Sequence, residues 1–298
     1  MRGLLLRAGL WLADLIARSL PSRVAYLVAD LGGRTWHRFA PRRRALVTES
    51  LTRVCAATGR PTDPATMRRV VRNAFVEHAR YYLELLRAPH YPRDRIDDFV
   101  SAEDWDRLEP ILRGGAVVAS LHLGNFEPFG HLLADHGFRV VAPVEEIRPR
   151  ELFDFMLAHR GAGRGAQIIP LAKSRRPMVE VLRAGGVVGM IADRDLAEDG
   201  IPVSMFGLPT TLPAGPAALA LMTDRPLLVA SCMRVGPDRF VGRTWMVETP
   251  RTDDRRADAE AMTREMGRHF ETAIGQLPEQ WWASFQPYWT DQRRRGSS

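Results

Sequence analysis

Short apolar runs alternate with segments of helical pattern after Pro92, and this alternation constrains the fold more than any other feature of the 298-residue chain. The apolar runs cover residues 116–121, 138–144, 167–171, 187–192, 226–235 and 240–248. Helical patterns extend to His136 after the first run and cover residues 151–160, 177–184, 213–223 and 258–277. Strands separated by helices of this length build layered α/β folds. We therefore predict an α/β fold with a central, mainly parallel or mixed sheet flanked by helices.

The first 100 residues lack this alternation and have helical patterns instead. Residues 3–18 predict an amphipathic helix, because Arg7, Asp14 and Arg18 share one face and apolar residues fill the other. From Ser22 to Leu86 the pattern stays helical, with a turn region at residues 59–64. With no internal repeat or linker apparent, we predict a single domain over residues 1–298. It comprises an amphipathic helix (1–18), a helical N-terminal layer (19–100) and an α/β catalytic core (101–290).

The helix at residues 1–18 has two interpretations. It is too short and too often interrupted to span a bilayer, which takes about 20 mostly apolar residues, and Asp14 breaks the apolar run of a signal peptide. It either packs on its own domain or lies in the membrane interface, which Trp11 and the flanking arginines favour. Two arginine clusters, at residues 38 and 42–44 and at residues 68, 69 and 72, are either solvated faces or a basic surface against an anionic membrane.

The chain carries a net charge of +7, and nearly all of its basic charge is arginine because Lys173 is the only lysine. This excess favours anionic partners such as phospholipid headgroups or a polyphosphate cofactor. No pattern typical of nucleic-acid binding is apparent, so nucleic acid is not a predicted partner. Cys55 and Cys232 are far apart and outside any ligand spacing, which predicts two buried, reduced thiols, no metal site and a cytosolic environment.

The candidate chemistry begins at the end of the first apolar run. His122 follows that run, Gly124 permits a tight turn, and Glu127 opens the next helix, where a carboxylate is stabilised. In this arrangement Glu127 would hydrogen-bond one imidazole nitrogen and leave the other free as a base. The spacing alone is weak, since about one histidine with an acid five residues later is expected by chance. The alternative is a strand-end histidine bonded to a backbone carbonyl, with Glu127 as an ordinary helix-opening acid.

A second strand end also carries charge. Asp193, Arg194 and Asp195 follow the apolar run at residues 187–192. Open α/β sheets build their sites at the carboxyl ends of strands. One interpretation is a loop with an internal ion pair, and the other is that at least one of the acids faces the same crevice as His122.

Four motifs stand in order along the chain. They are His122-Leu-Gly-Asn-Phe-Glu127, Ala192-Asp193-Arg194-Asp195, Met205-Phe206-Gly207 followed by Pro213-Ala-Gly215-Pro216, and Gln286-Pro287-Tyr288-Trp289. With these motifs the sequence resembles the bacterial lipid A biosynthesis acyltransferase superfamily over roughly residues 5–290. Within it, the chain is most similar to the actinobacterial phosphatidylinositol mannoside acyltransferases.

The resemblance implies a peripheral enzyme at the cytosolic face of the plasma membrane, which moves a fatty acyl group from acyl-CoA to a mannose hydroxyl of a phosphatidylinositol mannoside. It implies His122 as the general base, Glu127 as its orienting acid and Asp193, where mycobacterial relatives carry Glu, in a supporting role. Implied substrate-binding residues are Glu145, Arg160, Arg194 and Asp195. Lys173, Arg175 and Arg176 are candidate ligands of the CoA phosphates, with a solvated charge run as the alternative.

A thioester is already activated, so transfer requires only a base of near-neutral pKa, a positioned hydroxyl and donors for the oxyanion. We therefore expect direct, single-displacement transfer without a metal, a cofactor or a covalent intermediate. Backbone N–H groups of residues 124–126 are candidate oxyanion donors, and apolar side chains of residues 115–135 and 213–223 are candidate walls of an acyl groove. The alternatives are an acyltransferase for another glycolipid, one that uses acyl carrier protein, and a non-catalytic peripheral lipid-binding protein.

Overall fold

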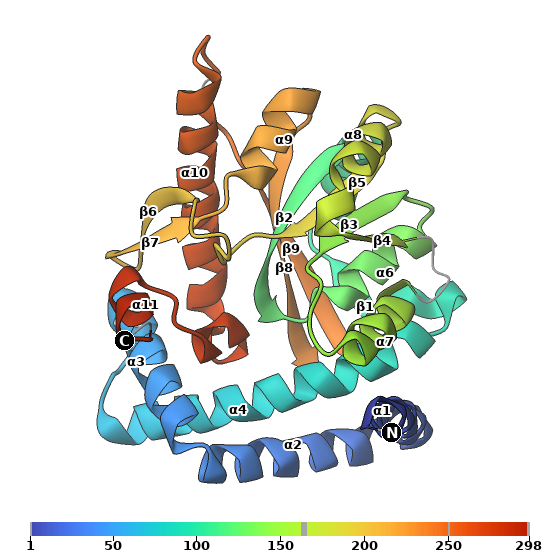
Figure 1. Ribbon diagram of the computed structural model, residues 1–298, viewed down its shortest axis with the longest axis vertical. Helices are drawn as coiled ribbons and strands as arrows, with labels where there is room; N and C mark the ends of the chain where they lie inside the picture. The colour runs from blue at the N-terminus through green and yellow to red at the C-terminus, as the bar shows by residue number, and fades with distance from the viewer. Residues whose placement is uncertain (1, 162–165, 250, 297–298) are drawn as a thin grey trace.

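The computed structural model describes residues 2–161, 166–249 and 251–296 and centres on a seven-stranded sheet (Figure 1). The strand order is β1-β9-β8-β2-β5-β3-β4, and every neighbouring pair is parallel except β8 and β9. The strands are β1 (Val100–Ala102), β2 (Ala116–Gly124), β3 (Val140–Val144), β4 (Ala166–Pro170), β5 (Val187–Ile191), β8 (Leu227–Gly236) and β9 (Arg239–Met246). The predicted α/β fold with a mainly parallel or mixed sheet is confirmed.

Helices cover both faces of this sheet. They are α5 (Trp105–Arg113), α6 (Glu127–Asp135), α7 (Arg150–Gly161), α8 (Arg175–Arg183), α9 (Gly215–Thr223) and α10 (Arg255–Gln276). The short helix α11 (Thr290–Gly296) lies away from this sheet and packs beside residues 208–212. In the central strand β2, Val117, Ala119 and Leu121 pack in one core with α8, α9 and α10, whereas Ala116 and Val118 pack in a second core with α5 and α6. This alternation is the two-residue period of a strand that is buried on both faces.

Four helices form the predicted N-terminal layer: α1 (Arg2–Ser19), α2 (Ser22–Phe39), α3 (Pro41–Ala57) and α4 (Pro64–Arg87). The long helix α4 starts at Asp63, whose carboxylate accepts the N–H groups of Ala65 and Thr66, and it passes below the sheet in Figure 1. Short 3-10 helices follow at Ala88–His90 (η1) and Arg93–Asp98 (η2), and others lie at Leu171–Lys173 (η3), Pro278–Gln280 (η4) and Trp282–Phe285 (η5). Across the described ranges, every helix is too short or too polar to cross a membrane.

A buried ionic network joins the N-terminal layer to the sheet. Glu84 of α4 is fully buried and accepts hydrogen bonds from Arg234 of β8, from the Tyr26 hydroxyl of α2 at 2.7 Å and from the Asn125 amide at 3.2 Å. Arg234, with 3% of its side chain exposed, also pairs with Glu77 of α4. Burial raises the pKa of Glu84 to about 8 and lowers the pKa of Arg234 to about 10. The hydrogen bonds of the Glu84 carboxyl group therefore connect α2, α4, β8 and the turn after β2.

A two-stranded antiparallel hairpin, β6 (Ile201–Met205) and β7 (Leu208–Leu212), stands outside the main sheet and is absent from the sequence prediction. Its turn has positive φ at Phe206 (54°) and Gly207 (75°), the geometry of a two-residue type I′ turn. A proline in each segment, Pro202 and Pro209, argues against a strand in the sequence, although Ile201, Val203 and Met205 alternate with non-core residues. Cys55 and Cys232 are buried and free, as predicted.

Replacing Arg234 with alanine will lower the free energy of unfolding by about 3–5 kcal/mol, because the fully buried Glu84 loses its ionic partner, whereas Glu77 keeps its pairing with Arg80. Urea denaturation followed by circular dichroism measures this loss. Arg95→Ala is the matched control, since exposed Arg95 pairs with exposed Asp98 three residues away and its loss costs at most about 0.5 kcal/mol. Equal losses in the two variants would contradict the structural role of the network.

Candidate active site

His122 lies two residues before the end of β2 and keeps 17% of its side chain exposed. Its Nδ1 atom is 2.6 Å from Oδ1 of Asp193, and its backbone N–H donates to Oδ2 of Asp193 at 3.1 Å. The register of the sheet brings the two residues together. In the adjacent parallel strands β2 and β5, Ser120 pairs with Ile191, so His122 and Asp193 each lie two residues further along. Of the acids at the second strand end, Asp193 is therefore the one that faces His122.

Asp193 is fully buried, and burial alone would raise its pKa. The charge and hydrogen bonds of His122, together with the Trp281 indole N–H that donates to Oδ2 at 3.0 Å, outweigh burial and hold the pKa of Asp193 below its ordinary value. The carboxylate is therefore ionised at neutral pH and accepts a proton-bearing Nδ1. In the neutral imidazole this leaves the lone pair on Nε2, which is the arrangement of a histidine ready to accept a proton.

The turn after His122 depends on Gly124. Its φ of +60° lies in the left-handed region, and a Cβ at this position would come within 2.1 Å of the Cys232 carbonyl oxygen on β8. The next residue, Asn125, donates its backbone N–H to that same carbonyl at 2.9 Å. The expectation that the N–H groups of residues 124–126 are oxyanion donors is therefore wrong for Asn125, because its N–H is already used inside the fold.

Asn125 links this turn to the buried network and to the following helix. Its side-chain oxygen accepts the backbone N–H of Glu127 at 3.1 Å, and its side-chain nitrogen donates to Glu84 at 3.2 Å. Glu127 opens α6, as predicted, and is 9% exposed. The orienting contact at Nδ1 of His122, which the sequence spacing paired with Glu127, is made by Asp193.

Aromatic side chains that the sequence analysis did not assign to the site lie against His122. The Trp282 ring meets the imidazole edge-to-face with 4.3 Å between centroids, and Tyr81 of α4 stacks on Trp282 at 4.6 Å. His78, also of α4, contacts Trp282 at 5.6 Å, and burial together with nearby positive charges lowers its pKa to about 3, so it is neutral. These residues come from α4 and η5, so no local sequence pattern connects them with His122.

Several predicted ligand residues lie at the same edge of the sheet, because β2, β3, β4 and β5 are parallel and end there. Glu145 directly follows β3 and is exposed. The basic residues Lys173, Arg175 and Arg176 follow β4 and are also exposed, and Arg176 pairs with Glu180 on its own helix. The side chain of Arg160 lies outside the described residues, although its backbone belongs to α7.

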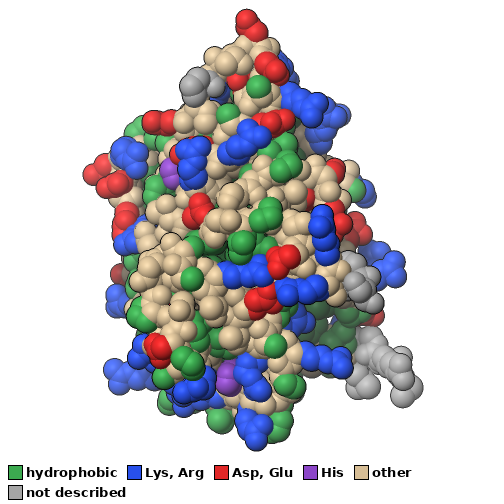
Figure 2. Space-filling model, turned by 90° about the vertical axis from the view of Figure 1, so that its left-hand side faces the viewer, with side chains coloured by type: hydrophobic (Ala, Val, Ile, Leu, Met, Phe, Trp, Pro, Cys, Tyr) green, Lys and Arg blue, Asp and Glu red, His purple; other side chains and the backbone are tan. Residues whose placement is uncertain are grey.

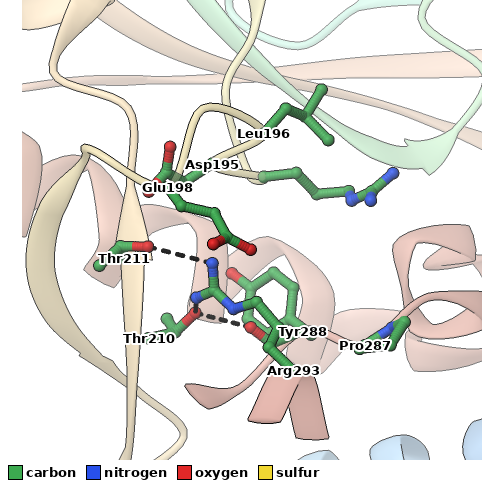
Figure 3. A pocket seen from close by; sticks show the side chains of 9 residues that line it. Asp195, Leu196, Glu198, Thr210, Thr211, Pro287, Tyr288 and Arg293 are labelled. Carbon is green, nitrogen blue, oxygen red and sulfur yellow. Dashed lines mark hydrogen bonds between the residues drawn. The ribbon is translucent and has the colours of Figure 1, made fainter. Parts of the chain in front are cut away.

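Arg194 and Asp195 line a polar pocket of about 240 Å³ beside the strand end. Figure 3 shows Arg293 in this pocket, with its guanidinium bonded to two threonine hydroxyls of the hairpin. The Asp195 carboxylate accepts the backbone N–H of Gly200 at 2.9 Å and so shapes its own loop. Among the residues that the structure describes, no hydrogen bond joins Asp195 to His122.

The fold and the site together define the class of protein. A mainly parallel sheet carries, at its carboxyl edge, a partly exposed histidine held by a buried carboxylate, which is how group-transfer and hydrolytic enzymes activate a hydroxyl or water. The chain matches the sequence model of the bacterial lipid A biosynthesis acyltransferase family over residues 5–290. It belongs to this family of acyltransferases, and the resemblance seen in its motifs is confirmed.

Relatives named phosphatidylinositol mannoside acyltransferase are similar along most of the chain. The protein of that name from Mycolicibacterium smegmatis is 30% identical over 236 residues, which cover 76% of this chain and 75% of the relative. Those from two strains of Mycobacterium tuberculosis are each 31% identical over 290 residues, covering 94% of this chain and 86% of theirs. The similarity therefore includes the N-terminal layer as well as the sheet.

Replacing Gly124 with alanine will destabilise the protein by more than about 3 kcal/mol, because the clash with the Cys232 carbonyl adds to the roughly 1–2 kcal/mol cost of a left-handed L-residue. Gly137→Ala is the matched control. Gly137 has a φ of +82° but open space around its Cβ position, so only the conformational cost applies. Chemical denaturation of both variants tests this, and equal losses would show that the close approach at Gly124 does not matter.

Proposed function

We propose that this acyltransferase moves a fatty acyl group from acyl-CoA to a mannose hydroxyl of a phosphatidylinositol mannoside. The observation that carries the proposal is the 2.6 Å contact between Nδ1 of His122 and the buried carboxylate of Asp193, which leaves Nε2 to take a proton. The acceptor is suggested by the relatives, which are each named for acylation of a phosphatidylinositol mannoside. Glu127, beside the turn that follows His122, completes the proposed catalytic group.

The proposed reaction is a direct displacement. Nε2 of His122 takes the proton of the acceptor hydroxyl while the hydroxyl oxygen attacks the thioester carbonyl carbon. A C–O bond forms, the C–S bond breaks with its electron pair on sulfur, and the imidazolium returns the proton to the CoA thiolate. Asp193 stabilises the imidazolium that forms in the first step, because its carboxylate lies 2.6 Å from Nδ1. This scheme uses no covalent acyl-enzyme, cofactor or metal ion.

Charged residues at the carboxyl edge of the sheet supply the proposed substrate contacts. Lys173 and Arg175 are exposed near the N-terminus of α8, where the helix dipole adds to their charge, and both suit the CoA phosphates. Arg176 belongs to the same proposed contact, with its pairing to Glu180 as a competing interaction. The residues proposed to contact the acceptor glycolipid are Glu145, Arg160, Arg194 and Asp195.

The purified protein, supplied with labelled palmitoyl-CoA and phosphatidylinositol dimannoside, is expected to form the acylated glycolipid. His122→Ala will reduce kcat about 10²–10⁴-fold, because it removes the general base. Asp193→Asn will also reduce kcat, because a neutral amide does not stabilise the imidazolium. His136→Ala is the matched control, since half-buried His136 pairs with exposed Asp97, and its activity is expected to equal that of the wild type.

Each alternative gives a different result in this assay. Transfer from acyl carrier protein but not from acyl-CoA would replace the donor, and transfer to another glycolipid alone would replace the acceptor. Equal rates for wild type and His122→Ala would overturn the role of the base. No transfer from either donor to any glycolipid would support a non-catalytic lipid-binding protein.

We further propose that the chain binds peripherally to an anionic membrane at the cytosolic face of the plasma membrane, through α1 and α2. Large hydrophobic side chains are exposed on both helices, each between 43% and 67%. They are Trp11, Leu12, Leu15 and Ile16 on α1, and Val24, Leu27, Val28 and Leu31 on α2. The spacing on α2 is that of one continuous helical face. A face of this kind on a surface helix suits insertion among lipid headgroups.

The charge around these apolar stripes supports the same orientation. Arg23, Arg34 and Arg38 are exposed on α2. Figure 2 shows basic side chains with hydrophobic ones between them at the lower end of the molecule, the end at which Figure 1 places α2. Of the predicted basic cluster, Arg43 and Arg44 do not contribute, because they donate to the backbone carbonyls of Phe285 and His37 and are partly buried.

The double variant Leu27→Asp/Leu31→Asp is expected to bind anionic vesicles at least tenfold more weakly, because two leucines that are each 67% exposed would no longer enter the apolar interface. Co-sedimentation with phosphatidylglycerol vesicles measures the change, and binding of the wild type should weaken as salt rises. Val235→Asp is the control, since Val235 is 63% exposed on β8, outside α1 and α2. Unchanged binding of the double variant would exclude this face as the membrane contact.

A further inference from the structure

Asp14, His90 and His159 come from three elements far apart in the sequence and meet at one point. Asp14 lies in α1, His90 in η1 and His159 in α7. The Nε2 atoms of both histidines are 3.1 Å from Oδ1 of Asp14, and the three atoms lie within 4.8 Å of one another. Asp14 is 2% exposed and His159 is 5% exposed, so the cluster is largely withdrawn from water.

The hydrogen bonding of His159 directs its Nε2 atom at the Asp14 carboxylate. Its Nδ1 lies 3.0 Å from the backbone carbonyl oxygen of Phe155, which can only accept, so Nδ1 carries the proton. In a neutral imidazole the lone pair is then on Nε2 and faces the Asp14 carboxylate. These two acceptors repel each other unless a proton or a metal ion lies between them. Arg18 approaches the other carboxylate oxygen of Asp14, at 3.7 Å.

We propose that Asp14, His90 and His159 bind a divalent transition-metal ion, for which Zn²⁺ is the best fit. Zinc takes imidazole nitrogen and carboxylate oxygen at about 2.0–2.2 Å in a tetrahedron, which sets neighbouring ligand atoms about 3.3 Å apart. The two nitrogen-to-oxygen separations of 3.1 Å are close to that value, and the third separation, between the two nitrogens, is within 4.8 Å. The His90 side chain is 38% exposed, so a water molecule can take the fourth position from the solvent side.

Two further contacts hold the side chains of this cluster in place. The Phe155 carbonyl gives His159 the outer hydrogen bond that fixes the ring of a metal-binding histidine. Trp11 of α1 packs edge-to-face on Phe155, with 5.4 Å between centroids, directly beside the cluster. The bound ion ties α1 to α7 and η1, with Asp14 turned inward and the apolar stripe of α1 turned outward. This inference does not depend on the proposed acyl transfer.

Untagged protein is stripped of metal with a chelator and titrated with Zn²⁺ by calorimetry and with Co²⁺ by visible absorption. Wild type is expected to bind one equivalent per chain and to show the visible bands of tetrahedral Co²⁺. His90→Gln and His159→Gln will each weaken binding at least tenfold, because each removes one of three ligands. His136→Gln is the matched control, since His136 meets a single carboxylate, that of Asp97, and should bind as tightly as wild type.

Folding and binding are separated by the choice of variant and by a second measurement. His90→Gln changes a partly exposed side chain, and circular dichroism checks that it folds. Zn²⁺ should raise the melting temperature of wild type and leave that of His90→Gln unchanged, since a ligand stabilises only a protein that binds it. Lack of stoichiometric binding by wild type would overturn the proposal. Equal affinity or equal thermal shift in His90→Gln would overturn it as well.

Discussion

Glu84 and Arg234 face each other where α4 meets β8, and neither side chain has appreciable access to water. Removing two charges from water is costly unless close contact and additional hydrogen bonds satisfy both groups. Here Tyr26 and Asn125 donate to the oxygens of Glu84, so the same carboxylate holds α2 and the turn after His122. Burial shifts the pKa of Glu84 upward and that of Arg234 downward, because desolvation disfavours the charged form of each group. The N-terminal layer therefore helps to hold the turn that follows His122, through the hydrogen bond between Glu84 and Asn125.

The geometry of the site follows from the sheet in the same way. Because β2 and β5 are adjacent and parallel, their register sets His122 and Asp193 opposite each other just beyond the last paired residues. Trp281 donates its indole N–H to the same Asp193 carboxylate. The buried Asp193 keeps a low pKa because it is fully satisfied, so its charge is available to an imidazolium over the whole neutral range. Two paired strands, the turn at Gly124 and one buried acid thus position His122 as a base.

The sheet was predictable to the extent that its strands are apolar on both faces. The run at residues 116–121 signals β2, but the strand continues to Gly124, which pairs with Cys232 of β8 after a register shift that follows Ser120. The site was less predictable, since sequence spacing reports neighbours along the chain. His122 and Glu127 are five residues apart in the sequence. The imidazole of His122 instead contacts Asp193, which follows the neighbouring strand β5 and is 71 residues away. The strand order decides which acid contacts the histidine, and no local sequence pattern predicts the strand order.

The orientation of the N-terminal helix α1 could not be predicted from its sequence pattern either. Arg7, Asp14 and Arg18 were expected to share one polar face, yet Asp14 is 2% exposed, because it bonds His90 and His159. Leu12 and Ile16 are instead 56% and 50% exposed, which reverses the usual orientation of a surface helix. Left alone in water, this orientation is unfavourable twice over, since it exposes apolar area and buries a carboxylate. Lipid on the outer side and a cation on the inner side would relieve the two costs separately. The proposed membrane contact therefore accounts for the exposed apolar face of α1, and the proposed metal site accounts independently for the buried Asp14 on its other face.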